Sequence, residues 1–244
     1  MKKLASGALL VALLVPLLAS ASIQVQGTRF IYPGNVREIT VDLHNEADRA
    51  ALVQSWLDSG DPSSEPGAEQ LPFVVLPPLV RVEPQVGQTL RIAYTGQVLP
   101  EDRESVFWLN VLDVPPKPQA NDGEEQNVMR LAFRTRVKMF FRPDGLQGSP
   151  EEAVKHMSWS LQPVGNGYAL RATNDSPYHV SFRDLALTSG GHTYPSIDSG
   201  MVDPYATADF PLKGLTSAVI SGEVVGHWLN DFGASVEQHY SLMR

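Results

Sequence analysis

The sequence predicts an all-β protein made of two β-sandwich domains. Three observations lead to this prediction: apolar residues recur at every second position in several short runs, Pro and Gly residues separate those runs, and no long amphipathic helix pattern is present. Many short strands separated by turn residues are typical of β-sandwiches. The one segment with the composition of a helix is short and runs from Pro150 to Met157.

The strand pattern is clearest in four segments. Residues 39–43 and 90–93 alternate apolar with polar or small side chains, as half-buried strands do. Residues 106–114 are mostly apolar and aromatic, which predicts a buried strand, and residues 129–139 alternate again. In this last segment five apolar residues share one register: Met129, Leu131, Phe133, Val137 and Met139.

The two domains are predicted to meet just after Arg142. The long alternating pattern ends there, and a polar stretch containing Gly and Pro continues to Pro150. We therefore expect an N-terminal domain over residues 22–143 and a C-terminal domain over residues 150–244. Each would have roughly 100 to 120 residues, close to the usual size of an immunoglobulin-like sandwich.

Residues 1–21 have the composition of a secretory signal peptide. Lys2 and Lys3 supply positive charge, residues 4–18 are mostly apolar, and residues 19–21 are small, as a signal peptidase requires. We expect cleavage after Ala21 and export across the inner membrane. An uncleaved membrane anchor is disfavoured because the apolar run is shorter than the ~20 residues that span a bilayer. No later segment is apolar enough to span a membrane either.

Composition and motifs argue against several classes of function. The formal net charge of −8 argues against binding to nucleic acids. Without cysteine the chain has no disulfide, no thiolate nucleophile and no Cys-based metal site. Its six histidines lack zinc-site spacing, and no nucleophile elbow or phosphate-binding Gly-rich loop occurs. We therefore expect a protein that is not an enzyme and that uses no metal or other cofactor.

Five segments carry a more specific signal. The segment Leu99–Trp108, with the sequence LPEDRESVFW, resembles closely the signature of the PapD-like periplasmic chaperones of pilus (fimbrial) assembly. Four further segments are similar to other landmarks of that family: residues 77–84, 136–143, 174–178 and 229–233. Together they cover essentially the whole mature chain in order, and five ordered matches are far more specific than one.

This resemblance implies a shape, a location and a function. Members of the family have two immunoglobulin-like domains in a boomerang arrangement with a cleft between them, and they act in the periplasm of Gram-negative bacteria. They bind and cap pilus subunits by donor-strand complementation, in which a strand of the chaperone fills the place of a strand that the subunit lacks. They then deliver the subunits to an outer-membrane usher. We therefore expect pilus subunits and an usher as partners.

Arg29 and Lys138 match the two cations that, in this family, bind the C-terminal carboxylate of the subunit. Two charge-assisted contacts to one carboxylate would also determine the register of the bound strand. Neither residue is expected to support the protein's own core. Without the resemblance, two solvated surface cations would be the more ordinary interpretation.

Met129, Leu131 and Phe133 match the donor strand, whose alternate side chains fill the groove of the subunit. The pattern by itself favours a different interpretation, in which these residues face the protein's own core. The adjacent match at residues 136–138 reverses that preference.

Glu104, Arg142 and Asp231 match an ion network across the domain interface. Such a network would hold the angle of the cleft rather than contact the subunit. Arg142 is suited to this because a guanidinium can bind two carboxylates at once. If the pairs are partly exposed, the loss of Arg142 would lower the free energy of unfolding by about 1 kcal/mol.

Two other functions stay open on sequence grounds. A pilus structural subunit or adhesin would have immunoglobulin-like domains, but a pilin usually carries an N-terminal donor extension, for which the chain before Arg29 leaves no room. A carbohydrate-binding β-sandwich would need an aromatic platform, although Trp108 is expected in the core because its strand is apolar. The residues available for a platform are Trp56, Trp108, Trp159 and Trp228.

Overall fold

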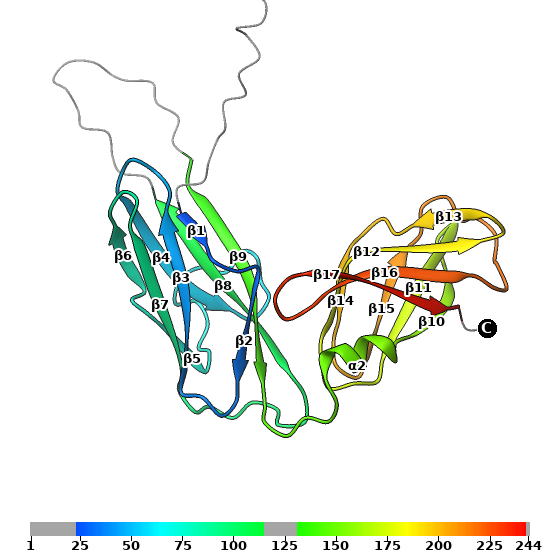
Figure 1. The fold of residues 1–244 in the computed structure, drawn as a ribbon, viewed down its shortest axis with the longest axis horizontal. Helices are drawn as coiled ribbons and strands as arrows, with labels where there is room; N and C mark the ends of the chain where they lie inside the picture. The colour runs from blue at the N-terminus through cyan, green and yellow to red at the C-terminus, as the bar shows by residue number, and fades with distance from the viewer. Residues whose placement is uncertain (1–22, 115–130, 243–244) are drawn as a thin grey trace, which may run out of the picture.

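The structure is a computed structural model that describes residues 23–114 and 131–242. Two β-sandwiches stand at an angle to each other and meet at the base of a V (Figure 1). The all-β, two-domain prediction is confirmed. The predicted short helix is also present, as α2 (Pro150–Lys155).

The first sandwich consists of two sheets, which contain the first nine strands of the chain. One sheet has the order β1 (Ile23–Val25), β3 (Glu38–Asn45), β7 (Gly87–Tyr94) and β5 (Phe73–Leu76). The other has the order β2 (Arg29–Pro33), β9 (Phe133–Arg142), β8 (Ser105–Val114), β4 (Ala51–Asp58) and β6 (Leu79–Val82).

The second sandwich follows the same principle. Its smaller sheet has the order β10 (Ser158–Val164), β11 (Gly167–Asn174) and β15 (Ala206–Pro211). Its larger sheet has the order β13 (His192–Pro195), β12 (Val180–Ser189), β16 (Glu223–Leu229) and β17 (Ser235–Ser241), and β14 (Gly200–Val202) also pairs with β12. α2 begins at the capping residue Ser149, whose hydroxyl accepts a hydrogen bond from the Glu152 amide (3.2 Å).

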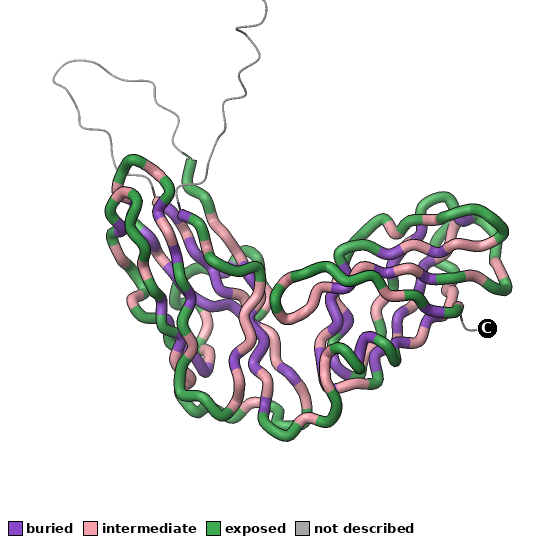
Figure 2. Tube along the Cα trace, in the orientation of Figure 1, coloured by how far each residue is buried: buried purple, intermediate pink, exposed green. Residues whose placement is uncertain are grey.

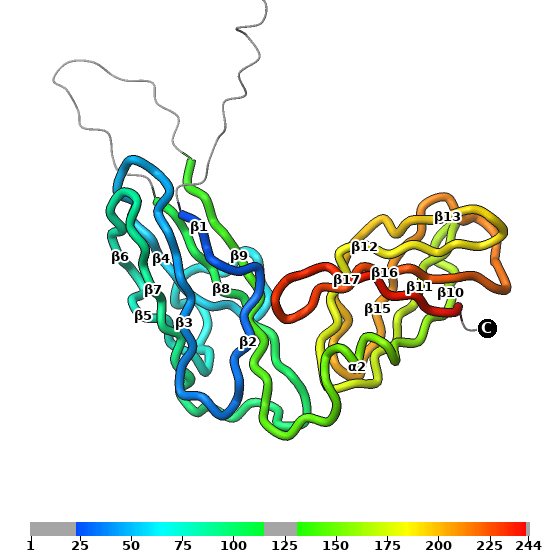
Figure 3. The backbone as a smooth tube through the Cα atoms, viewed as in Figure 1, coloured from blue at the N-terminus to red at the C-terminus, as the bar shows by residue number. Residues whose placement is uncertain are grey.

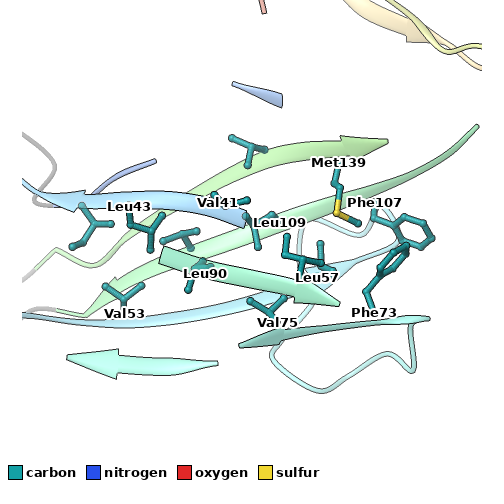
Figure 4. Close-up of a cluster of buried hydrophobic side chains, with 14 of the residues drawn as sticks. Val41, Leu43, Val53, Leu57, Phe73, Val75, Leu90, Phe107, Leu109 and Met139 are labelled. Atoms are coloured by element: carbon teal, nitrogen blue, oxygen red, sulfur yellow. The ribbon is translucent and has the colours of Figure 1, made fainter. Parts of the chain in front are cut away.

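Each sandwich has its own apolar core, and alternation along the strands generates it. In Figure 4 the side chains of Val41, Leu43 and Leu90 come together with Leu109 and Met139 between the two sheets of the first domain. The second core surrounds the fully buried Trp159, which contacts other aromatic rings. Buried residues lie in the interior of both sandwiches, with exposed residues concentrated in turns (Figure 2). The two cores make both domains rigid supports for the interface between them.

The first domain leaves one edge of β9 partly unpaired. β1 and β2 belong to different sheets, and the chain crosses between them near Gly27, whose φ of 130° suits glycine. β2 runs parallel to β9 and pairs only with its second half, from Arg29 opposite Lys138 to Pro33 opposite Arg142. Within the described residues, the first half of β9 therefore pairs with β8 alone.

Candidate functional site

A groove runs along the open edge of the first half of β9, opposite the edge that pairs with β8. It has a volume of about 830 Å³, and it lies between the β1–β2 crossover and β9. Val25 and Thr28 line one side, and Thr135 and Val137 line the other. A strand edge with free N–H and C=O groups next to a groove is a ready template for pairing with another chain.

The donor residues predicted from sequence lie at the open end of this edge. Leu131 is 59% exposed and Phe133, the first residue of β9, is 42% exposed. Val137 and Met139 share the face of Phe133, but they are buried in the first core. The interpretation that places Leu131 and Phe133 in the protein's own core is therefore wrong. Met129 lies outside the described residues.

Arg29 and Lys138 lie side by side, because they are register partners on β2 and β9. Burial lowers the pKa of Lys138, and the positive charge of Arg29 lowers it further, while Asp203 partly opposes this. Burial also lowers the pKa of Arg29, against the opposing charges of Asp231 and Glu104. In the part of the chain that the structure describes, Lys138 has no ion pair or hydrogen bond. Two half-buried cations without a bound anion form a favourable site for a carboxylate.

Arg29 has a second role that the sequence did not indicate. Its guanidinium donates a hydrogen bond to the Leu229 carbonyl at the end of β16 (2.8 Å), and it lies over the Phe140 ring at 5.5 Å. Arg29 therefore connects the two domains as well as facing the groove. This contact between the domains is additional to the expectation that Arg29 does not support the protein's own core.

Glu104, Arg142 and Asp231 come together across the domain interface. Arg142 donates one hydrogen bond to Glu104 (2.7 Å) and two to Asp231 (2.7 and 2.9 Å). Burial alone would lower the pKa of Arg142, but the hydrogen bonds and charges of the two carboxylates raise it above its usual value. Glu104 is buried, so its hydrogen bonds must offset the cost of removing this side chain from water.

His179 belongs to the same network, and sequence reasoning missed it. Its backbone N–H donates to Glu104 Oε2 (2.8 Å), and its ring Nδ1 lies 3.1 Å from the same oxygen. The His179 ring also contacts the Phe140 ring, with 5.4 Å between centroids. The only sequence signal is its position immediately after the family-like segment at residues 174–178. His179 thus connects the ion network to the residues beneath the cation pair.

A buried carboxylate on β4 holds β9 in place, and it was also missed. Asp58 is fully buried and accepts hydrogen bonds from Arg136 on β9, from Asn110 Nδ2 (2.7 Å) and from the Gly60 amide (2.8 Å). Arg134 lies 3.7 Å from the same carboxylate. Burial opposes the ionisation of Asp58, but these hydrogen bonds together lower its pKa below the usual value.

Asp58→Asn is expected to lower the free energy of unfolding by about 3 kcal/mol, because it leaves two partly buried guanidinium groups without their buried anion. The native stabilisation is full above the unfolded pKa of about 3.9, and it is lost as the pH falls through the lower folded pKa. Urea unfolding at pH 7 and at about pH 3 checks this. The difference between the wild type and Asp58→Asn should shrink at the lower pH, and a constant difference would contradict the assignment.

The tryptophans do not form a sugar-binding platform. Trp56, Trp159 and Trp228 are buried. Trp108 is only partly buried on the outer face of its sheet, where the Arg136 guanidinium lies 4.8 Å from its ring, so the expectation of a core position is wrong. The error arose because an apolar strand can still have one face outside the core. Across the described residues no His, Asp or Glu side chains gather as a metal site requires.

The described part of the chain has no helix long and apolar enough to cross a bilayer. The predicted signal peptide at residues 1–21 lies outside the described residues.

Comparisons with known proteins agree with this geometry. The chain is 44% identical over 223 residues to the probable fimbrial chaperone YadV of Escherichia coli K12, covering 91% of this chain and 90% of that protein. It is 40% identical over 234 residues to the chaperone protein FimB/FhaD of Bordetella pertussis, covering 94% and 91%.

Solved structures give the same result. The crystal structure of the YadV chaperone superposes with a TM-score of 0.78 at 39% identity, covering 91% of this chain and all of that one. The SafB chaperone of Salmonella enterica, solved in complex with the SafA pilin, superposes with a TM-score of 0.73 at 29% identity, covering 91% and 97%.

Family models divide the chain into two matched regions. Residues 22–147 match the PapD N-terminal domain of pili and flagellar-assembly chaperones, and residues 152–240 match the PapD C-terminal domain of pili assembly chaperones. These matches, with the two sandwiches and the open edge of β9, show that the chain belongs to the PapD family of pili assembly chaperones.

Proposed function

We propose that this protein is a non-enzymatic periplasmic chaperone that captures pilus subunits on the open edge of β9 and delivers them to an outer-membrane usher. One observation carries the proposal. Leu131 and Phe133 are exposed at one end of the open edge of β9, and the cation pair Arg29 and Lys138 lies at the other end of that edge. A subunit strand placed along this edge gains backbone hydrogen bonds, apolar pockets and a charged end point together.

The other parts of the chain have supporting roles in this proposal. Residues 1–21 direct export and are removed, residues 22–143 form the subunit-binding domain, and residues 150–244 form the second domain. The network of Glu104, Arg142 and Asp231 holds the angle between the domains. Export to the periplasm agrees with the solved structure of the periplasmic chaperone SfaE, which this chain resembles with a TM-score of 0.66 at 26% identity.

The direct test is purification of the tagged protein from the periplasm of the cells that naturally produce it. We expect an untagged subunit to co-purify, and its mass and peptide fragments identify it. N-terminal sequencing of the chaperone should begin at Ser22. Recovery of the chaperone alone, under conditions in which the subunit is made, would exclude the proposed function.

Phe133→Asp is expected to abolish capture of that subunit, because binding would place a carboxylate in an apolar pocket without a partner. The free protein should stay folded, since Phe133 is 42% exposed and substitutions at exposed positions usually change stability by less than about 0.5 kcal/mol. Val98→Asp, at an exposed site outside the groove, is the matched control and should retain capture. Equal capture by both variants would show that β9 is not the donor strand.

A further inference from the structure

The turn between β16 and β17 extends from the second domain to the first. In Figure 3 this hairpin, in red, reaches toward β2 and β9 across the interior of the V. Two of its groups are bound there: Asp231 by Arg142 (2.7 Å), and the Leu229 carbonyl by Arg29 (2.8 Å). The turn thus lies next to the cation pair.

The turn is also rigid within itself. The side-chain oxygen of Asn230 accepts hydrogen bonds from the Phe232 amide (3.1 Å) and the Ala234 amide (2.9 Å). The Asn230 carbonyl accepts a third from the Gly233 amide (2.9 Å). An asparagine that bonds the backbone two residues ahead stabilises a tight turn. The backbone of this turn is therefore held in one conformation.

Gly233 packs the turn directly against the start of β2. A Cβ atom at this position would lie 2.0 Å from the hydroxyl oxygen of Thr28, and φ is 79°, so glycine is required for two independent reasons. Thr28 is also one of the residues that line the groove beside β9. The turn and the groove therefore meet at Thr28.

Phe232 stands between two residues that contact the first domain, yet its side chain is 92% exposed. Asp231 on one side is bound by Arg142, and Gly233 on the other side abuts Thr28. A single exposed apolar residue is ordinary on a mobile loop. A large aromatic side chain on a hydrogen-bonded turn next to a groove residue is different, because the backbone that carries it is already ordered before binding.

We propose that Phe232 is a specificity contact for the pilus subunit, through which the second domain binds an apolar side chain near the subunit's C-terminus. The inference rests on the proposed function. A subunit segment that follows the groove past Thr28, and ends with its carboxylate on Arg29 and Lys138, passes the turn that carries Phe232. The contact is independent of the carboxylate, because Phe232 supplies apolar area rather than charge.

The test uses the subunit that co-purifies with the wild-type chaperone. Two synthetic peptides with the last ~12 residues of that subunit, enough to follow an extended groove, serve as probes. One has a free C-terminal carboxylate and the other has a C-terminal amide. Phe232→Ala is expected to lower the affinity for both peptides about tenfold, as the loss of a buried aromatic contact does. Lys138→Ala should weaken only the peptide with the free carboxylate.

Two further variants make the result specific. Phe232→Leu keeps an apolar side chain and should retain most of the affinity. Ile220→Ala, at another highly exposed apolar residue of the second domain (78% exposed), should leave the affinity unchanged. Thermal unfolding of each variant reports whether it folds.

Different failures have different meanings. If Phe232→Ala binds both peptides as tightly as the wild type, the Phe232 contact is wrong while the proposed function stands. If Phe232→Ala weakens only the peptide with the free carboxylate, the turn acts by positioning Arg29, and the specificity contact is again wrong. If the wild type captures no subunit at all, the proposed function fails and the inference fails with it.

Discussion

Lys138→Ala is expected to weaken subunit binding about 30-fold while leaving the free protein folded. The substitution removes one charge-assisted contact to the carboxylate, which contributes about 2 kcal/mol. The same substitution should not destabilise the free protein. Burial and the neighbouring Arg29 both lower the pKa of Lys138, so at pH 7 its charge is unfavourable in the folded state. Binding should fall while the free energy of unfolding stays the same or rises.

Arg29→Ala distinguishes the role of Arg29 from that of Lys138. It should weaken binding to a similar extent, but it should also destabilise the free protein, because Arg29 donates to the Leu229 carbonyl and covers the Phe140 ring. The double variant should have nearly the same affinity for the subunit as either single variant, because both cations bind one carboxylate and their effects are coupled. Titration calorimetry with the co-purified subunit and urea unfolding measure both quantities. Unchanged affinity in both single variants would remove the carboxylate anchor from the proposal.

Arg142→Ala should have the largest effect on the free protein. The structure raises the expected loss above the figure of about 1 kcal/mol for exposed pairs, because Glu104 is buried and would lose its guanidinium partner. Breaking a buried pair from one side costs about 3 to 5 kcal/mol. The hairpin that carries Asp231 would also lose two hydrogen bonds to the first domain. We therefore expect lower stability together with a wider range of domain angles.

Arg91→Ala is the matched control for this substitution. Arg91 pairs with Glu38 on adjacent strands of the first domain, and both side chains are exposed, so its loss should cost less than about 1 kcal/mol. Small-angle scattering should show a broader distribution of shapes for Arg142→Ala and no change for Arg91→Ala. Equal losses of stability in the two variants would mean that burial of Glu104 does not strengthen the interdomain network.

Residues 129–139 show where sequence reasoning reaches its limit. One alternating pattern covers this segment, but Val137 and Met139 are buried in the core while Leu131 and Phe133 are exposed. Alternation identifies which side chains share a face of a strand. It does not identify which strands pack against that face, because those strands come from distant parts of the chain. Only the folded structure shows that the core ends before Phe133.

The residues that were missed have the same explanation. Asp58, His179 and the Leu229 carbonyl lie far along the chain from the groups they bind, and none belongs to a short motif with its own chemistry. Asp58 resembles any polar residue at the end of a strand until β9 brings Arg136 beside it. Backbone carbonyls carry no sequence signal at all.

The sequence alone establishes the all-β class and the family, and it predicts an export signal and the position of the linker, because periodicity, turn residues and short motifs are local properties of the chain. It also identified Arg29, Lys138 and the ion network as candidates through resemblance. The fold alone shows which edge of β9 is open, which of its side chains are exposed, and that the turn carrying the exposed Phe232 abuts the groove residue Thr28 through Gly233. These features depend on contacts between residues remote in sequence, and burial and charge pairing arise only when the folded chain brings those residues together.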